Sequence, residues 1–368
     1  MLTAELSTTI NQPSPKIDDT FSDTTPSAVN VTTERLPTPH ELKLEFPLTL
    51  RGVKAIQEGR DLIRRILRRE DQRLLVVVGP CSLHDPDSAV EYARRLVELQ
   101  ETCRDKVVLV MRAYLEKPRT TIGWRGYLND PNLDGSCDMI EGLRQSRRLL
   151  TALADCGIPL ATELLDIAAS AYYSDLISFA AIGARTAESQ PHRALVSGLD
   201  IPAGFKNGTD GCLATAINGI LAAAQGHAYF GLGEDGQACI MRTHGNSDTL
   251  MILRGGRGGP NYDAVEVAKA EEEMKLCGLL PTLMVDCSHA NSGSNPDRQM
   301  DVCDNVISQR RDGNQSLVSV MIESHLHAGK QTLNADAIRS GLRYGVSVTD
   351  ACVDWDSTQT MISRLAAG

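Results

Sequence analysis

The sequence lacks the features that mark membrane-spanning, exported and nucleic-acid-binding proteins. No apolar run approaches the roughly 18 residues that a membrane span requires. The N-terminus has no basic start followed by an apolar stretch, and its acidic residues argue against a transit peptide. The formal net charge is -10, so we expect neither nucleic acid nor an anionic membrane as the main partner. We therefore expect a cytoplasmic protein.

Paired cysteines are also lacking, because the ten cysteines are scattered singly and no CxxC pair occurs. A chain of 368 residues buries enough apolar surface to need no disulfides, so this pattern predicts free thiols in a reducing compartment. The length fits one barrel of roughly 250 residues with appendages.

The composition divides the chain into three parts. Residues 1–33 are rich in Ser, Thr, Asn and Pro with few large apolar groups, which predicts a disordered polar tail. Residues 34–70 are predicted to form an N-terminal arm followed by a helix at about 53–69. Residues 71–368 carry the main folded domain, into which a segment at about 226–248 is inserted.

The main domain shows a repeating pattern of short apolar segments and helical stretches. The apolar segments lie at 74–79, 107–111, 158–162, 178–183, 200–205, 249–253, 282–286 and 317–322. The helical stretches lie near 87–101, 139–156, 166–177, 211–225, 263–277 and 297–311. Eight strands that alternate with helices indicate an α/β protein with a parallel sheet, and the number eight favours closure into a (β/α)8 TIM barrel.

Two segments interrupt this rhythm. Apolar runs at 228–232 and 238–241 flank a Gly-Glu-Asp-Gly turn, which predicts a β-hairpin inserted on the barrel rim. Residues 114–137 form a loop longer than the usual connection between strand and helix, and this length makes the loop a candidate functional segment.

Polar residues follow the predicted strands at the end where barrel enzymes carry their active sites. In chain order they are Cys81, Arg112, Glu163, Arg185, Lys206, Arg254, the turn from Asp286 to His289, and Glu323. Four of them are cations, which would repel one another in a shared cavity unless anions fill it. The alternative for each cation is an ion pair with a carboxylate on the rim.

The loop at 116–121, Glu-Lys-Pro-Arg-Thr-Thr, adds two cations and two hydroxyl groups beyond Arg112. It is either a second anion site or a basic loop in solvent.

The remaining strand ends carry groups that bind metals. Cys81, His289, Glu323 and Asp350 offer a thiolate, an imidazole and two carboxylates, a set that suits a catalytic divalent ion. A buried cysteine is more often a packing residue, and these four residues meet only if the barrel closes. The competing histidines lie further from strand ends and are ranked lower: His84, His192, His325 and His327.

Seven ordered motifs resemble the type I DAHP synthases (3-deoxy-D-arabino-heptulosonate-7-phosphate synthases). They are Gly79-Pro80-Cys81-Ser82, Glu116-Lys117-Pro118-Arg119-Thr120-Thr121, Gly183-Ala184-Arg185-Thr186, Gly204-Phe205-Lys206-Asn207-Gly208-Thr209-Asp210-Gly211, Ile252-Leu253-Arg254-Gly255-Gly256, Ser288-His289-Ala290-Asn291 and Ile322-Glu323-Ser324. The resemblance covers about residues 36–365. It implies a metal-dependent barrel that condenses phosphoenolpyruvate with erythrose 4-phosphate at the entry to aromatic amino acid biosynthesis.

The resemblance also implies roles for individual residues. The implied metal ligands are Cys81, His289, Glu323 and Asp350, for a divalent ion of the Mn, Fe, Co or Zn type. The implied substrate-binding residues are Arg185 and Arg254 for the phosphate of phosphoenolpyruvate, Arg112 and Lys206 for its carboxylate, Lys117, Arg119 and Thr120 for the aldose phosphate, and Glu163 and Ala184 beside them. The implied catalytic cations are Lys117, Lys206 and Arg112. Lys117 or a metal-bound water is the candidate for proton transfer.

Regulation and assembly are expected to follow the family, with an aromatic amino acid as effector and a homodimer or homotetramer as the assembly. The chain departs from many relatives near the expected effector pocket, with Ser170 and Ala171 ahead of Tyr172 and with Asp200 where a serine is common. An acidic side chain changes the charge of such a pocket. We therefore expect insensitivity to phenylalanine and tyrosine, or a response to tryptophan.

Two other functions remain open from the sequence. Lys206 at a strand end could form an imine, as in a Schiff-base aldolase. A non-catalytic sensor of sugar phosphates or amino acids would share the fold without the reaction.

Overall fold

Eight parallel strands close into a barrel, which confirms the predicted fold. The computed structural model describes residues 32–368, so the tail predicted for residues 1–33 lies almost wholly outside the described residues. Around the barrel the strands follow the order β1-β10-β9-β8-β5-β4-β3-β2. Their bounds are β1 Leu74–Gly79, β2 Val107–Arg112, β3 Leu160–Glu163, β4 Phe179–Ile182, β5 Ala203–Lys206, β8 Thr249–Leu253, β9 Leu283–Asp286 and β10 Leu317–Glu323.

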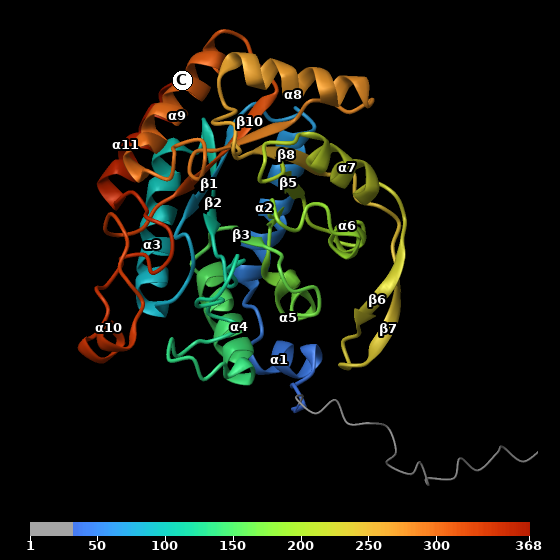
Figure 1. Cartoon of the computed structure of the whole chain (residues 1–368), viewed down its shortest axis with the longest axis vertical. Coiled ribbons are helices and arrows are strands. Elements are labelled where there is room, and N and C mark those ends of the chain that lie inside the picture. The colour runs from blue at the N-terminus through green and yellow to red at the C-terminus, as the bar shows by residue number, and fades with distance from the viewer. Residues whose placement is uncertain (1–31) are drawn as a thin grey trace, which may run out of the picture. The chain divides into compact units, whose positions relative to one another are not determined.

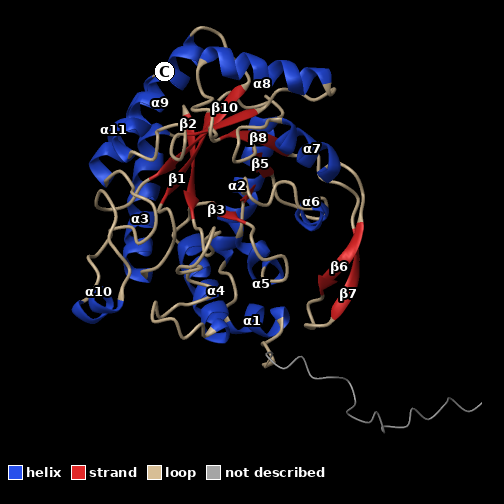
Figure 2. Ribbon diagram, in the orientation of Figure 1, coloured by secondary structure: helices blue, strands red, loops and turns tan. Residues whose placement is uncertain are grey.

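Helices surround the strands, as Figures 1 and 2 show. Their bounds are α1 Pro39–Glu45, α2 Leu50–Leu67, α3 Pro86–Cys103, α4 Met139–Asp155, α5 Ser170–Tyr173, α6 Gln190–Val196, α7 Ala214–Ala223, α8 Ala264–Leu276, α9 Gln299–Arg311, α10 Ala335–Ser340 and α11 Trp355–Ala367. Across residues 32–368 none of them is both long enough and apolar enough to span a membrane.

The structure corrects several predicted elements. The helix expected at 166–177 is reduced to the single turn of α5 and a following 3-10 turn at Ser174–Leu176. The strand expected at 200–205 begins only at Ala203, because Pro202 has no N–H to donate to a neighbouring strand. The helices α1, α6, α10 and α11 were not predicted, and α1 lies within the predicted arm. The longest of these is α11. Asp354 is its N-cap residue, and the Asp354 side chain accepts a hydrogen bond from the Ser357 N–H.

Helix α2 closes the amino-terminal end of the barrel. Its apolar side places Ile63, Ile66 and Leu67 in the same buried cluster as the residues that fill the barrel, such as Leu75 and Val77. A cluster of apolar side chains therefore plugs this end, and the opposite end, where the strands terminate in polar residues, is left for a site.

The predicted hairpin is present, formed by β6 (Ala228–Leu232) and β7 (Ala238–Arg242) in antiparallel register. It lies outside the barrel, at the right of Figure 2. Phe230 and Ile240 face each other across the strands with 88% and 61% of their surfaces exposed. The hairpin turn contacts the arm, because His40 N–H donates a hydrogen bond of 3.0 Å to Glu234 O.

Candidate active site

The polar side chains at the strand ends point into the barrel because side chains alternate along each strand. In β2, Val108 and Val110 belong to the apolar cluster inside the barrel, and Arg112 continues the same row. In β1, Val77 lies in this cluster and Cys81 follows at an even spacing. The same spacing holds for Glu163, Arg254, Asp286 and Glu323, and Lys206 alternates with Phe205, which belongs to the other apolar cluster. The alternation that fills the barrel thus also assembles the site.

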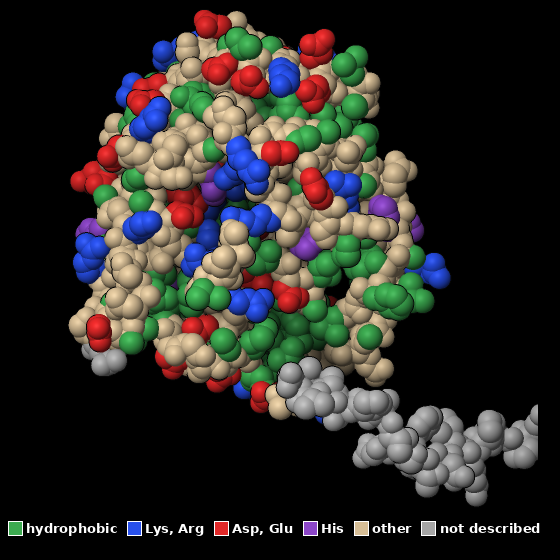
Figure 3. Space-filling model, viewed as in Figure 1, with side chains coloured by type: hydrophobic (Ala, Val, Ile, Leu, Met, Phe, Trp, Pro, Cys, Tyr) green, Lys and Arg blue, Asp and Glu red, His purple; other side chains and the backbone are tan. Residues whose placement is uncertain are grey.

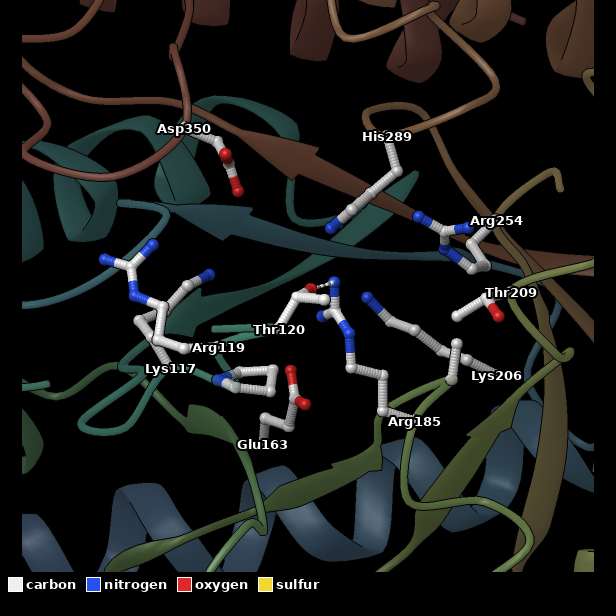
Figure 4. A pocket seen from close by; sticks show the side chains of 13 residues that line it. Lys117, Arg119, Thr120, Glu163, Arg185, Lys206, Thr209, Arg254, His289 and Asp350 are labelled. Carbon is white, nitrogen blue, oxygen red and sulfur yellow. Dashed lines mark hydrogen bonds between the residues drawn. The ribbon is translucent and has the colours of Figure 1, made fainter. Parts of the chain in front are cut away.

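A polar cavity of about 270 Å³ opens at this end of the barrel. It is lined by Lys117, Pro118, Arg119, Thr120, Glu163, Gly183, Ala184, Arg185, Lys206, Thr209, Arg254, His289 and Asp350. Figure 4 shows their side chains converging from different strands and loops. In Figure 3, Lys and Arg side chains gather near the centre of this face. Apart from Arg112, which is buried beneath the cavity, every residue predicted to bind substrate lines it.

Three of the four predicted metal ligands come together. One donor atom each from Cys81, Glu323 and Asp350 lies within 4.8 Å of the other two, so this group could hold a metal ion. His289 is outside this group. It lines the same cavity as Asp350, and Figure 4 shows both side chains pointing into it. The Nδ1 atom of His289 lies 2.9 Å from Oδ2 of the buried Asp286.

The Cys81 thiol has the surroundings of a metal ligand. Burial, reinforced by the charge of Glu323, raises its pKa to about 11, against the opposing effect of Lys117. Its Sγ accepts a hydrogen bond of 3.0 Å from Lys117 Nζ and lies 3.4 Å from Asp350 Oδ2. The thiol is therefore protonated until a cation replaces the proton, as happens when thiolates bind metals. One thiolate and two carboxylates are donors that suit a first-row divalent ion.

Two of the four strand-end cations are paired with carboxylates, so the alternative that the sequence left open for each cation holds for these two. Arg112 Nη2 lies 3.1 Å from Glu323 Oε1, and Lys206 Nζ lies 2.9 Å from Asp286 Oδ2. All four of these side chains are almost fully buried, so neither charge could remain there without a partner.

The other two cations, Arg185 and Arg254, have no carboxylate within ion-pair distance among residues 32–368. Arg185 Nη2 donates a hydrogen bond of 3.2 Å to Thr120 Oγ1, and Arg254 Nη1 lies 3.5 Å from Gly255 O. Their positive charges therefore face the cavity without an acidic partner.

The basic loop at 116–121 belongs to the same cavity rather than to a separate site. Lys117 is only 8% exposed, and Arg119 Nε donates a hydrogen bond of 2.7 Å to Trp124 O, which fixes the loop. Because Thr120 bonds to Arg185, the two cation clusters that the sequence suggested are in direct contact. Lys117 is therefore not a solvated cation, whereas Arg119 and Thr120 line the cavity and remain exposed.

Asp286 and Ser288 are site residues to which the sequence analysis assigned no role. Burial would raise the pKa of Asp286, but His289 and Lys206 hold it well below its usual value. Asp286 therefore carries a negative charge between the two. Ser288 Oγ donates a hydrogen bond of 2.9 Å to Glu323 Oε2 and orients that carboxylate. The position of Asp286 at the end of β9 was the available signal, because inward-facing strand ends form the site.

The fold and the cavity together place this chain in the class of (β/α)8 barrel enzymes that have a cationic cavity at the carboxyl ends of the strands. Residues 46–363 match the DAHP synthetase I family, and the chain belongs to this family. This confirms the resemblance drawn from the seven motifs.

Named relatives agree with the family match. The chain is 51% identical to the Tyr-sensitive phospho-2-dehydro-3-deoxyheptonate aldolase of Escherichia coli K12, over 92% of this chain and 94% of the relative. It is 46% identical to the Phe-sensitive aldolase of the same organism, over 90% of this chain and 94% of that one. The solved structure of a phospho-2-dehydro-3-deoxyheptonate aldolase from Francisella tularensis superposes with a TM-score of 0.89 at 40% identity, covering 92% of this chain and 98% of that one.

A buried acid beside the cavity generates a prediction about pH. Glu116 is 2% exposed, and its Oε2 accepts hydrogen bonds from Asp166 N at 3.3 Å and from the Tyr173 hydroxyl at 3.4 Å. Burial raises its pKa from 4.5 to about 7. A raised carboxyl pKa stabilises the fold fully below pH 4.5, and this contribution is lost as pH rises through 7.

Glu116→Gln should therefore remove a pH-dependent loss of stability. We expect the variant to match the wild type near pH 4.5 and to exceed its free energy of unfolding by up to about 3 kcal/mol at pH 8. Urea unfolding at both pH values measures this, with Glu98→Gln on the exposed side of α3 as the control. Identical pH dependence in wild type and Glu116→Gln would contradict the assignment.

Proposed function

We propose that this chain condenses phosphoenolpyruvate with erythrose 4-phosphate to give 3-deoxy-D-arabino-heptulosonate 7-phosphate and phosphate, with the help of a divalent metal ion. The observation that carries the proposal is one cavity lined by two arginines without carboxylate partners, by the Lys117–Thr120 loop and by Asp350 of the Cys, Glu and Asp cluster. Two anionic substrates would account for the arginines and the basic loop, and one metal ion would account for the Cys, Glu and Asp cluster. Membership of the DAHP synthetase I family supports the proposal.

Phosphoenolpyruvate would bind across the inner part of the cavity. Arg185 and Arg254 bind its phosphate, because guanidinium groups bind phosphate oxygens in pairs. Arg112 and Lys206 bind its carboxylate. Arg112 is suited to this role because its buried Nη1 has no hydrogen-bond acceptor within residues 32–368, and a substrate oxygen would supply one. Glu163 and Ala184 line the wall beside this position.

Erythrose 4-phosphate would bind at the outer part of the cavity, where Lys117, Arg119 and Thr120 meet its phosphate. The cations counter the repulsion between two anionic substrates, which can then be held at reaction distance. The contact between Thr120 and Arg185 sets the two subsites next to each other.

Cys81, Glu323 and Asp350 would hold the metal ion, with His289 as the fourth ligand. The donor set fits an ion of the Mn, Fe, Co or Zn type. When bound, the ion would polarise the aldehyde oxygen as a Lewis acid. Carbon 3 of phosphoenolpyruvate then attacks the aldehyde carbon, water adds at carbon 2, and phosphate leaves.

Lys117 is the residue that we assign to proton transfer. Burial would lower its pKa, but Cys81, Glu323 and Asp350 raise it above its usual value, so its ammonium group is fully protonated. Its Nζ lies 3.0 Å from Cys81 Sγ, next to the proposed metal ligands. A protonated amine there is placed to neutralise the oxygen that develops negative charge.

The geometry disfavours the Schiff-base alternative. An imine-forming lysine must be neutral, whereas Asp286 raises the pKa of Lys206 against the effect of burial. The 2.9 Å ion pair occupies the amine. Borohydride added with substrates should give no covalent adduct at Lys206.

A direct test is phosphate release from phosphoenolpyruvate. We expect release only when erythrose 4-phosphate and a divalent metal are both present, and loss of release on chelation. Cys81→Ser should reduce kcat by at least about 100-fold because it removes a ligand, whereas exposed Cys277→Ser should leave it unchanged. Release without the aldose or after complete chelation would contradict the proposal.

We propose an oligomeric assembly from the exposed apolar side chains of the β6–β7 hairpin. Phe230 and Ile240 form an exposed apolar pair, which favours a homodimer or homotetramer that covers them. Light scattering tests this, and a monomeric mass would contradict it.

An aromatic amino acid is the proposed effector, in line with relatives named Tyr-sensitive and Phe-sensitive. In the region expected to bind it, Asp200 forms an ion pair with Arg64 of α2, and its side chain is 79% exposed. The Tyr172 hydroxyl donates a hydrogen bond of 2.9 Å to Pro37 O of the arm.

We expect the acidic Asp200 to weaken inhibition by phenylalanine and tyrosine, and a response to tryptophan remains compatible with it. Initial rates with each of the three amino acids at millimolar concentration test this expectation. Strong inhibition by phenylalanine or tyrosine would contradict it.

A further inference from the structure

Tyr114 lies beneath the proposed active site and has no role in the reaction described above. It follows Arg112 by two residues and continues the inward-facing row of Val108 and Val110. Its side chain is buried within the apolar cluster that fills the barrel. Its hydroxyl group donates to Met321 Sδ at 3.7 Å.

The ring of Tyr114 supports two of the cations. The guanidinium carbon of Arg112 lies over the ring, 4.0 Å from its centroid. Lys117 Nζ lies 5.9 Å from the same centroid. The ring is therefore the boundary between the apolar barrel interior and the charged cavity.

The Arg112 guanidinium has few other fixed contacts. Its Nη2 lies 3.1 Å from Glu323 Oε1, and its Nε donates to Pro80 O at 3.4 Å. Its Nη1 has no acceptor in the part of the chain that the structure describes. A second carboxylate below Arg112 would hold it more firmly but would repel an anionic substrate. The electron-rich face of an aromatic ring attracts a cation without adding a net negative charge.

We propose that Tyr114 is a positioning residue whose ring face holds the Arg112 guanidinium so that Nη1 is directed at the carboxylate of the substrate. This inference rests on the proposed function, in which Arg112 binds the carboxylate of phosphoenolpyruvate. The ring also lies close enough to Lys117 to reduce the repulsion between the two cations. The hydroxyl group is expected to contribute little, because its one hydrogen-bond partner among residues 32–368, a thioether sulfur, is a weak acceptor.

A graded series at position 114 separates this role from simple packing. Tyr114→Phe retains the ring, and replacement by mono-, di- and trifluorinated phenylalanines retains its shape while progressively weakening the negative charge of its face. A packing role would make all four variants alike. Steady-state kinetics give kcat and the KM for each substrate, and calorimetry gives the affinity for phosphoenolpyruvate.

We expect Tyr114→Phe to stay within about threefold of the wild type and the KM for phosphoenolpyruvate to rise stepwise with fluorination, reaching about tenfold. The KM for erythrose 4-phosphate should rise less, because Lys117 is further from the ring than Arg112.

A flat series, or a loss in Tyr114→Phe as large as in the trifluorinated variant, would overturn the proposal. Failure of the proposed function would differ from both results, because the wild type itself would then not consume phosphoenolpyruvate.

Discussion

Unbalanced positive charge at the carboxyl ends of the strands is the constraint on which the rest of the site depends. Four cations from different strands converge there, and like charges in a partly buried cavity repel strongly. The protein neutralises the two deepest, Arg112 and Lys206, with buried carboxylates. Arg185 and Arg254 keep their charge free where it reaches the cavity. The fold thus concentrates its unpaired positive charge at the surface that an anionic substrate would touch.

The neutralising carboxylates also connect the cations with the proposed metal ligands. Glu323 pairs with Arg112 and belongs to the cluster with Cys81 and Asp350. Asp286 lies between Lys206 and His289. Each carboxylate therefore lies beside both a proposed substrate-binding cation and a proposed metal ligand. A change of charge at the cations would alter the electrostatic potential at the proposed metal ligands, and the reverse also holds. Burial alone would raise the pKa of Glu323, but the combined opposing effects, chiefly of His289 and Arg112, are larger, so its pKa lies below the usual value. This shared carboxylate is therefore ionised.

The sequence predicted the barrel well because its strands are short apolar runs with polar residues at one end. Strand alternation explains why the candidate residues meet: Cys81 and Arg112 continue the rows of side chains that fill the barrel. The pairing of charges could not be predicted in this way. Arg112 and Glu323 lie on β2 and β10, which are separated by β1, so their contact depends on side-chain length and direction across the barrel.

Other errors have local causes. The helix expected at 166–177 contains two serines that begin and end short turns, and only one α-helical turn forms. Helix α6, seven residues long, was not among the predicted helices, although the proline in its first turn is a signal that favours a helix start. The assignment of His289 as a metal ligand stays a prediction, and the 2.9 Å contact of its Nδ1 with Asp286 Oδ2 is a feature that the sequence pattern did not reveal.

The most direct measurement is calorimetric binding of phosphoenolpyruvate to three forms of the protein: wild type, Arg254→Ala and Arg257→Ala. Arg257 lies exposed on the loop after Arg254 and outside the cavity lining, so it controls for a general change of charge. The account predicts that Arg254→Ala weakens binding by about 10- to 100-fold and that Arg257→Ala leaves it within about twofold. Equal affinities for all three forms would contradict the claim that the unpaired arginines exist to bind phosphate.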